Sequence, residues 1–249
     1  MTVKMPMFAR PFVSGAIARA MPRAAPAGRI AEPGCPDGPH IGDLFALNER
    51  PPCTSVAFDI VGFGERCRDD EVQIFVHRSL YGMLKQAFDE VGISWPATHH
   101  EDRGDGALIL VPAGTSPAVL VGPLVAELAR CLRQYNKLVA DAAQIRLRMA
   151  VHSGPIFQDA NGLVGSCLVH LFRMLEAPEF KRLVAGSGTD LGVVASERIY
   201  RDVIEPAATF PGIGVFQPIE VVLKETRTSA WVYLSDDPRA AALSDLLSA

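Results

Sequence analysis

The stretch from residue 56 to residue 65, VAFDIVGFGE, determines how the rest of the chain is interpreted. It opens, with Ser55 before it, as an apolar run typical of a buried strand. The run ends in one carboxylate, Asp59, and two glycines follow it at once. An aspartate in this position suits a catalytic acid, a metal ligand or an ordinary turn. A partner elsewhere in the chain has to decide between them.

The segments after this strand alternate between helical and strand-like patterns. Apolar residues recur at helical spacing in two segments, and the flanking segments alternate as strands do. We therefore expect helices over 71–92, 122–142 and about 167–176; a hairpin over 98–112 with its bend at 104–106; strands over 145–157 and 191–196; a loop over 161–165; and a final hairpin-like pair over 214–225 and 229–236.

The first part of this order, strand, helix, strand, turn, strand, helix, strand, predicts a ferredoxin-like α+β fold, βαββαβ, with additions at its C-terminal end. That fold places the end of the first strand beside the first hairpin. Asp59 and Asp105 are therefore expected to meet in space.

Two carboxylates that converge beside glycine-rich backbone suit a two-metal site, because hard cations take oxygen ligands and orient phosphates. Taken alone, Asp59 can be a strand-end cap and Asp105 a hairpin-turn residue. Their joint occurrence favours the metal site. We also expect both carboxylates to lack a nearby cationic partner.

The composition narrows the class of protein. The chain has 249 residues, 49% of them hydrophobic, and a formal net charge of -4, so we expect no nucleic-acid partner and no membrane partner. Five widely spaced cysteines without a C-x-x-C motif indicate a reduced, cytoplasmic protein. Residues 1–50 are expected to be a disordered extension, residues 54–236 the folded domain, and residues 237–249 a tail.

Three segments, FDIVGFGE, EDRGDGALIL and RMAVHSGPI, in this order and spacing, resemble the catalytic domain of class III nucleotidyl cyclases. The resemblance implies two divalent ions, Mg²⁺ or Mn²⁺, held by Asp59, Asp105 and the backbone carbonyl of Ile60. It also implies that the backbone at Gly62, Phe63 and Gly64 contacts a triphosphate. The implied reaction is attack of a ribose 3′-hydroxyl on the α-phosphate, giving a 3′,5′-cyclic nucleotide and pyrophosphate.

Later motifs match the family less closely. In the segment GSCLVHLFR, Arg173 matches the arginine that stabilises the transition state, whereas Val169 stands where the ribose-orienting asparagine is expected. His170, one position on, is either a substitute for that asparagine or a structural histidine, and His152 is expected to be structural. Arg173 can also be an ordinary solvated helix residue. The C-terminal hairpin offers Lys224 and Arg227 as phosphate contacts or as edge-strand charges.

The base-reading positions depart from the purine cyclases. Glu101 stands where adenylyl cyclases have lysine and guanylyl cyclases have glutamate. A carboxylate only accepts hydrogen bonds, so it favours the N–H edge of guanine or uracil, or the amino group of cytosine, over adenine. The second position is Gly162, which leaves no normal purine pair. These features look like the bacterial pyrimidine cyclases of Pycsar anti-phage signalling, and UTP is favoured over CTP. The alternative for His99 to Asp102 is a solvated charge cluster.

The resemblance implies a homodimer that takes a nucleoside triphosphate, with Asp59, Ile60 and Asp105 from one subunit and Arg173 from the other. Guanylate, adenylate or cytidylate cyclase activity stays open. So does a catalytically silent cyclase-like domain that binds a nucleotide as a regulator, which the loss of the asparagine at Val169 favours.

Overall fold

The computed structural model describes residues 53–159, 162–207 and 215–235. All of them belong to one compact unit, Ile41–Ala249. The segments expected to be a disordered extension and a tail lie outside the described residues.

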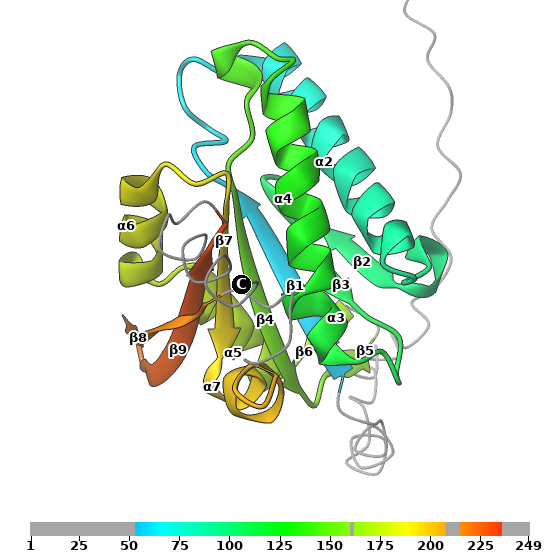
Figure 1. Ribbon diagram of the computed structural model, residues 1–249, viewed down its shortest axis with the longest axis vertical. Helices are drawn as coiled ribbons and strands as arrows, with labels where there is room; N and C mark the ends of the chain where they lie inside the picture. Colours follow the sequence, from blue (N-terminus) through cyan, green and yellow to red (C-terminus); the bar gives the residue numbers. More distant parts are fainter. Residues whose placement is uncertain (1–52, 160–161, 208–214, 236–249) are drawn as a thin grey trace, which may run out of the picture. The chain divides into compact units, whose positions relative to one another are not determined.

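A seven-stranded mixed sheet forms the centre of the fold, in the order β2-β3-β1-β4-β7-β9-β8 (Figure 1). Its neighbours are antiparallel except for the parallel pair β4 and β7. The strands are β1 Cys53–Ile60, β2 His99–Asp102, β3 Gly106–Leu110, β4 Leu147–Gly154, β7 Leu191–Ser196, β8 Gln217–Leu223 and β9 Thr226–Leu234.

The helices connect these strands and cover both faces of the sheet. They are α2 Asp70–Glu90, α3 Pro117–Val121, α4 Pro123–Asn136, α5 Ser166–Leu175, α6 Pro178–Ser187 and α7 Glu197–Ile199, with short turns at η2 Trp95–Ala97, η3 Asp141–Ala143 and η4 Tyr200–Ile204. No helix among the described residues is long and apolar enough to span a membrane.

The predicted βαββαβ order is confirmed by β1, α2, β2, β3, α4 and β4, and the predicted α+β class with it. The four strands stand in the order β2-β3-β1-β4, which is the order of a ferredoxin-like sheet. Strands β7, β8 and β9 extend this sheet beyond β4, as the C-terminal additions expected from the sequence.

Alternation along the strands separates two apolar layers. Phe58 and Ile60 pack with α2 and α4, which lie side by side across one face (Figure 1), while Ala57 packs with α5 and α6 on the other. Asp59 alternates with Phe58 and Ile60, so it lies on the α5 face together with Ala57. This alternation decides which helix the candidate site faces.

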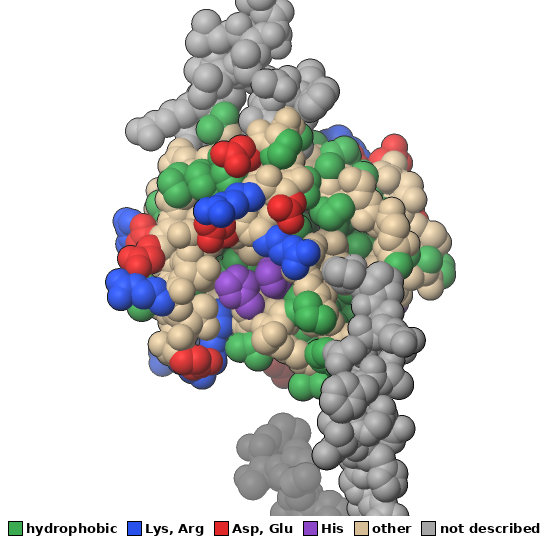
Figure 2. Space-filling view, turned by 90° about the horizontal axis from the view of Figure 1, so that it is seen from below, with side chains coloured by type: hydrophobic (Ala, Val, Ile, Leu, Met, Phe, Trp, Pro, Cys, Tyr) green, Lys and Arg blue, Asp and Glu red, His purple; other side chains and the backbone are tan. Residues whose placement is uncertain are grey.

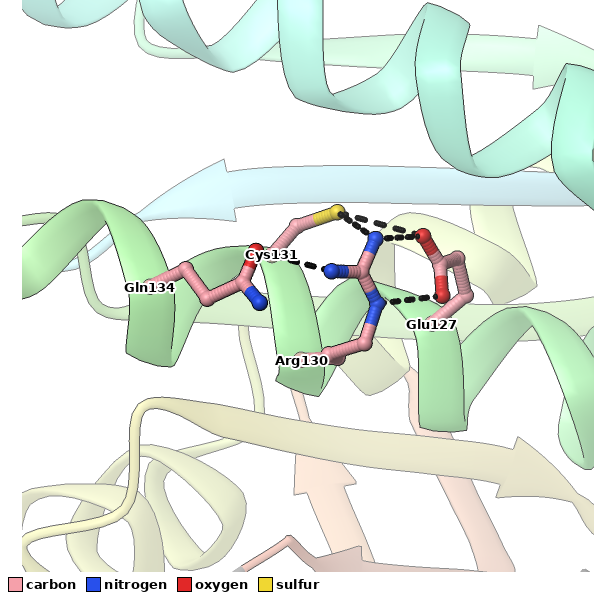
Figure 3. Close-up of polar contacts among 4 residues, drawn as sticks. All are labelled: Glu127, Arg130, Cys131 and Gln134. Carbon is pink, nitrogen blue, oxygen red and sulfur yellow. Dashed lines mark hydrogen bonds and ion pairs between the residues drawn. The ribbon is translucent and has the colours of Figure 1, made fainter.

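Polar side chains order the solvent side of α4. Arg130 forms a fork with Glu127 and donates to Gln134 Oε1 at 2.7 Å (Figure 3). Burial raises the pKa of the neighbouring Cys131 thiol to about 11, so this cysteine is a protonated packing residue at neutral pH. The contacts of Arg130 with Glu127 and Gln134 join residues of α4 only and do not involve the sheet.

Two local expectations are wrong. The segment 161–165 was expected to be a loop, but Gly162–Val164 forms β6, which pairs with β5, Phe157–Asp159, in a separate two-stranded sheet. The strand expected over 145–157 accordingly ends at Gly154, before β5 begins. Helix α6 was not predicted, because it follows α5 after a break of only two residues, Glu176 and Ala177.

Candidate active site

Strands β1 and β3 bring the two predicted carboxylates together. Asp59 stands opposite Gly106 in the ladder, and the backbone N–H of Ile60 donates to the carbonyl oxygen of Asp105 at 2.9 Å. The strands are this close because residue 106 is glycine: a Cβ there would lie 1.9 Å from the Phe58 carbonyl oxygen. The expectation that Asp59 and Asp105 would be neighbours is therefore met.

Asp59 has a cationic partner, contrary to expectation. Strand β4 places Arg148 directly opposite Asp59, and the guanidinium donates to the Asp59 carboxylate. Both side chains are almost buried, with exposed fractions of 11% for Arg148 and 9% for Asp59. The expectation that both carboxylates lack a nearby cation is thus wrong for Asp59. The error arose because Arg148 is remote in sequence and is brought to β1 only by the ladder.

The surroundings of Asp59 favour its protonated form despite this contact. Burial raises the pKa of Asp59 to about 6, and the nearby charges of Asp105 and Glu176 act in the same direction, while Arg148 opposes them. Added positive charge stabilises the ionised form of a carboxyl group that has two acidic neighbours. The surroundings of Asp59 are therefore suited to a cation.

The loop after β1 offers unused backbone donors. The N–H groups of Gly62, Phe63 and Gly64 make no backbone hydrogen bond within the described part of the chain. Gly62 has a φ of 67°, a left-handed conformation that favours glycine. Arg68 fixes the loop by donating to the carbonyl oxygens of Ala142 and Gln144. Successive free N–H groups of this kind suit an anion such as a phosphate.

The residues present fit divalent cations of the Mg²⁺ type. Such ions are bound by one or two carboxylates together with substrate phosphates and water, and Asp59 and Asp105 supply the two carboxylates. No group of three or more His, Cys, Asp or Glu side chains suited to a metal occurs among the described residues. The donor set is therefore incomplete without a phosphate-bearing ligand.

Glu101 lies on β2, on the same face of the sheet as Asp59, but it is not a free acceptor. Its two carboxylate oxygens accept from His99 Nε2 at 3.2 Å and from Arg103 at 2.7 Å. Arg103 in turn lies over the ring of Phe172 in α5, 5.2 Å from its centroid. The predicted base-reading carboxylate is thus part of a row of polar groups.

The side chains of His99 to Asp102 are exposed except for the half-buried Glu101, which fits the alternative of a solvated charge cluster, but alternation divides them between the two faces of the sheet. Asp102 points to α2, where His77 and Tyr81 contact its carboxylate, and its Oδ1 also accepts from the backbone N–H of Gly104. His100 stacks on Trp95. Only His99 and Glu101 remain on the α5 face.

Helix α5 carries Arg173, whose side chain is 20% exposed and donates to Glu225 in the β8–β9 turn at 3.0 Å. Its Nε is buried and has no hydrogen-bond partner within the described residues. Val169, one helical turn earlier, is 50% exposed. His170 instead lies against His152, with ring centroids 4.7 Å apart, so its ring is committed to another contact.

The C-terminal hairpin holds the two predicted phosphate contacts, Lys224 and Arg227. Lys224 is exposed in the turn between β8 and β9, and its φ of 52° marks a tight turn. Arg227 is paired with Glu220 at 2.7 Å on the exposed surface of the same hairpin. Strands β4 and β7 lie between β1 and β9 in the sheet. Neither Lys224 nor Arg227 therefore belongs to the Asp59 group of the same chain.

His152 and His170 lie at the other end of the strands. His152 pairs with Ser55, four residues before Asp59, and its Nδ1 contacts Ser196 Oγ at 2.8 Å. Burial lowers the pKa of His152 to about 4, so it is neutral at physiological pH. Figure 2 looks onto the end of the molecule at which α7 lies and shows histidine beside basic and acidic side chains. These contacts support the structural interpretation of His152.

The interpretation of the sequence assigned no role to Arg148, Arg103 or Phe172, although the segments RMAVHSGPI and EDRGDGALIL contain the two arginines. Arg148 directly precedes the segment MAVHSG. By alternation along β4 its side chain lies on the α5 face, which indicates a contact with Asp59 once the β1–β4 register is known. Arg103 and Phe172 meet only through the packing of α5 on the sheet. No local pattern could have found that contact.

Solved structures provide a comparison for this geometry. A crystal structure of the guanylyl cyclase Cya2 matches with a TM-score of 0.54 and 17% identity, covering 74% of this chain and 91% of that one. An adenylate/guanylate cyclase/hydrolase from Silicibacter pomeroyi matches with a TM-score of 0.52 and 18% identity, covering 76% of this chain and 99% of that one. The chain has the fold of nucleotidyl cyclase domains.

A structure of adenylate cyclases from Trypanosoma brucei in their monomeric state matches with a TM-score of 0.52 and 14% identity, covering 78% of this chain and 94% of that one. No protein-family model matches the chain, and no curated protein sequence matches it either. At these identities the structural likeness establishes the fold.

Proposed function

We propose that this chain is a nucleotidyl cyclase, which converts a nucleoside triphosphate to its 3′,5′-cyclic nucleotide and pyrophosphate. The observation that carries the proposal is the meeting of Asp59 and Asp105 beside free backbone N–H groups, on a cyclase-type fold. Two carboxylates next to a phosphate-binding loop are the groups that a metal-dependent phosphoryl transfer needs.

Two Mg²⁺ or Mn²⁺ ions held at Asp59 and Asp105, with the Ile60 carbonyl as a further ligand, would lower the pKa of the ribose 3′-hydroxyl and neutralise phosphate charge. The chain's own part is to position the substrate. The N–H groups of Gly62, Phe63 and Gly64 would hold the triphosphate, and Arg148 would add positive charge beside Asp59.

The site requires a second copy of the chain. Arg173 would stabilise the charge that develops on the α-phosphate, and Lys224 or Arg227 would contact the phosphates, but both hairpin cations lie away from the Asp59 group of their own chain. In a homodimer the carboxylates of one subunit would face Arg173 of the other. Two identical sites would then form at one interface.

The proposed substrate is UTP, because Glu101 accepts hydrogen bonds and Gly162 supplies no side chain for reading a purine. Together with the segments GFGE and HHEDRGDG, this supports a role as a pyrimidine cyclase that makes a second messenger in anti-phage defence. Cytidylate, guanylate and adenylate cyclase activities are the alternatives within the same reaction.

A catalytically silent nucleotide-binding regulator is the second candidate function. Two observations favour it: Val169 replaces a polar residue on α5, and Arg148 neutralises Asp59. The persistence of Asp105 and of the free loop N–H groups favours the enzyme.

One assay separates the two functions. The purified protein is incubated with Mn²⁺ and each of the four ribonucleoside triphosphates, and products are identified by mass spectrometry. The enzyme is expected to release a cyclic nucleotide, mainly cUMP, with one pyrophosphate for each, and Asp105→Asn is expected to release none. Nucleotide binding without any cyclic product would instead support the regulator.

A further inference from the structure

The edge strand β2 and the turn after it present a row of three polar side chains, which we call the β2 row: His99, Glu101 and Arg103. His99 and Arg103 both contact the Glu101 carboxylate, at 3.2 and 2.7 Å. The three side chains are 43%, 27% and 40% exposed, so all of them remain accessible to a ligand. The His99 N–H is engaged by Glu101, so the row offers a ligand the remaining N–H donors of Arg103 beside the remaining lone pairs of the Glu101 carboxylate.

Arg103 is held in place by more than its ion pair. Its guanidinium lies 5.2 Å from the centre of the Phe172 ring, so it is fixed between that ring on α5 and the Glu101 carboxylate. A guanidinium has five N–H donors, and the contact with Glu101 engages only part of them. Arg103 thus presents further donors in a fixed direction.

A hollow of about 220 Å³ adjoins the row at His99. That is below the roughly 300–1,000 Å³ of sites that take drug-sized molecules, so it suits one small ring system. Its walls are mostly apolar, with polar groups from β2 and β5. The lining residues are Cys53, His99, Leu110, Ala113, Ile156, Gln158 and Leu163.

We propose that Arg103 is a base-selecting residue that acts together with Glu101, and that the β2 row selects uracil. This inference rests on the proposed function and names the residue that decides its substrate. Gly162 leaves the usual second reading position without a side chain, and Arg103 supplies the missing polar group from β2 instead.

The match follows from the hydrogen-bonding edges of the bases. The imide edge of uracil presents the acceptor O4 beside the donor N3–H, which pair with the remaining N–H groups of Arg103 and the remaining lone pairs of Glu101. Cytosine has an acceptor at N3, which would meet the acceptor Glu101. Guanine presents the same acceptor and donor at O6 and N1–H, but it is a two-ring base, whereas the adjoining hollow suits one small ring system. Adenine presents no N–H at its ring nitrogen.

The test compares the affinities of the full-length protein for α,β-methylene analogues of UTP and CTP with Mn²⁺, measured by calorimetry. The variant is Arg103→Met, which keeps the aliphatic stem and removes the donors. The control is Arg130→Met, because Arg130 pairs with Glu127 on α4, away from the row. Binding of analogues that cannot cyclise separates base selection from catalysis.

Wild type and Arg130→Met are expected to bind the UTP analogue at least about tenfold more tightly than the CTP analogue, and Arg103→Met is expected to lose this ratio. An unchanged ratio in Arg103→Met, or equal weakening for both analogues, would overturn the inference, since a merely structural arginine affects both alike. Absence of selectivity in wild type would overturn it as well. Formation of cyclic product by wild type separately decides the proposed function.

Discussion

At the scale of single residues, Asp59 and Arg148 dominate the candidate site. A buried pair of this kind costs desolvation on both sides, and removing one partner leaves an uncompensated charge. The negative charges of Asp105 and Glu176 lie near the Asp59 carboxylate and raise its pKa. The positive charge of Arg148 acts against them. The contact with Arg148 thus lowers the pKa of Asp59 against the effect of burial and of the two acidic neighbours.

This pairing predicts that Arg148 competes with a divalent ion. Arg148→Gln should bind Mn²⁺ more tightly than wild type without nucleotide, by about tenfold, because the Asp59 carboxylate loses its competing cation. Titration calorimetry measures this directly. Arg146→Gln is the control, since Arg146 contacts the carbonyl oxygens of Thr189 and Val184 instead of Asp59. Equal or weaker binding by Arg148→Gln would contradict the competition.

The raised pKa of Asp59 predicts how metal binding depends on pH. The folded protein takes up a proton at Asp59 near pH 6, above the range of a free aspartate, and a metal needs the ionised form. Mn²⁺ affinity should therefore be nearly full above pH 7 and should fall by about tenfold between pH 7 and pH 5. Asp59→Asn should bind weakly throughout and lack this step. A wild-type affinity that stays constant from pH 7 to pH 5 would refute the assignment.

At the scale of elements, the β1–β3 ladder places the site. Gly106 permits the close approach of the two strands, and the backbone bond from Ile60 to Asp105 fixes the turn that carries the second carboxylate. The helix pair α2 and α4 supports this ladder from one face, and α5 supports it from the other. The register of one strand pair thus sets the distance between the carboxylates.

A substitution at Gly106 should therefore damage both stability and site. Gly106→Ala would place its Cβ 1.9 Å from the Phe58 carbonyl oxygen, so we expect it to lower the free energy of unfolding by about 2 to 4 kcal/mol. Urea denaturation measures the change. Gly82→Ala on α2 is the control: its Cβ would meet nothing within 4 Å, and it should stabilise by about 0.5 to 1 kcal/mol. A neutral Gly106→Ala would contradict the close approach of β1 and β3.

The elements themselves were largely predictable from the sequence. The apolar periodicity of α2 and α4 and the glycine-aspartate-glycine bend gave the βαββαβ order, and that order alone brought Asp59 to Asp105. The partner of Asp59 was not predictable in the same way, because Arg148 lies on a strand whose register depends on tertiary packing. The stack of Arg103 on Phe172 likewise depends on where α5 settles on the sheet.

At the scale of the whole molecule, the groups of the candidate site occur in two sets on the α5 face. Asp59, Asp105 and Arg148 gather where β1 ends, while Arg173 is held by Glu225 of the β8–β9 turn. A two-fold arrangement of two chains would let each set complete the other. The proposed enzyme would then be active only as a dimer with shared sites.

Mixing two inactive variants tests this central claim most directly. Asp59→Ala removes a carboxylate from one half of the site and Arg173→Ala removes the cation from the other, so each homodimer should be inactive. After subunit exchange, the equimolar mixture should form cyclic nucleotide at about a quarter of the wild-type rate, since half of the dimers would hold one intact site. A mixture that exchanges subunits, as followed by mass spectrometry, and yet remains inactive would contradict the account.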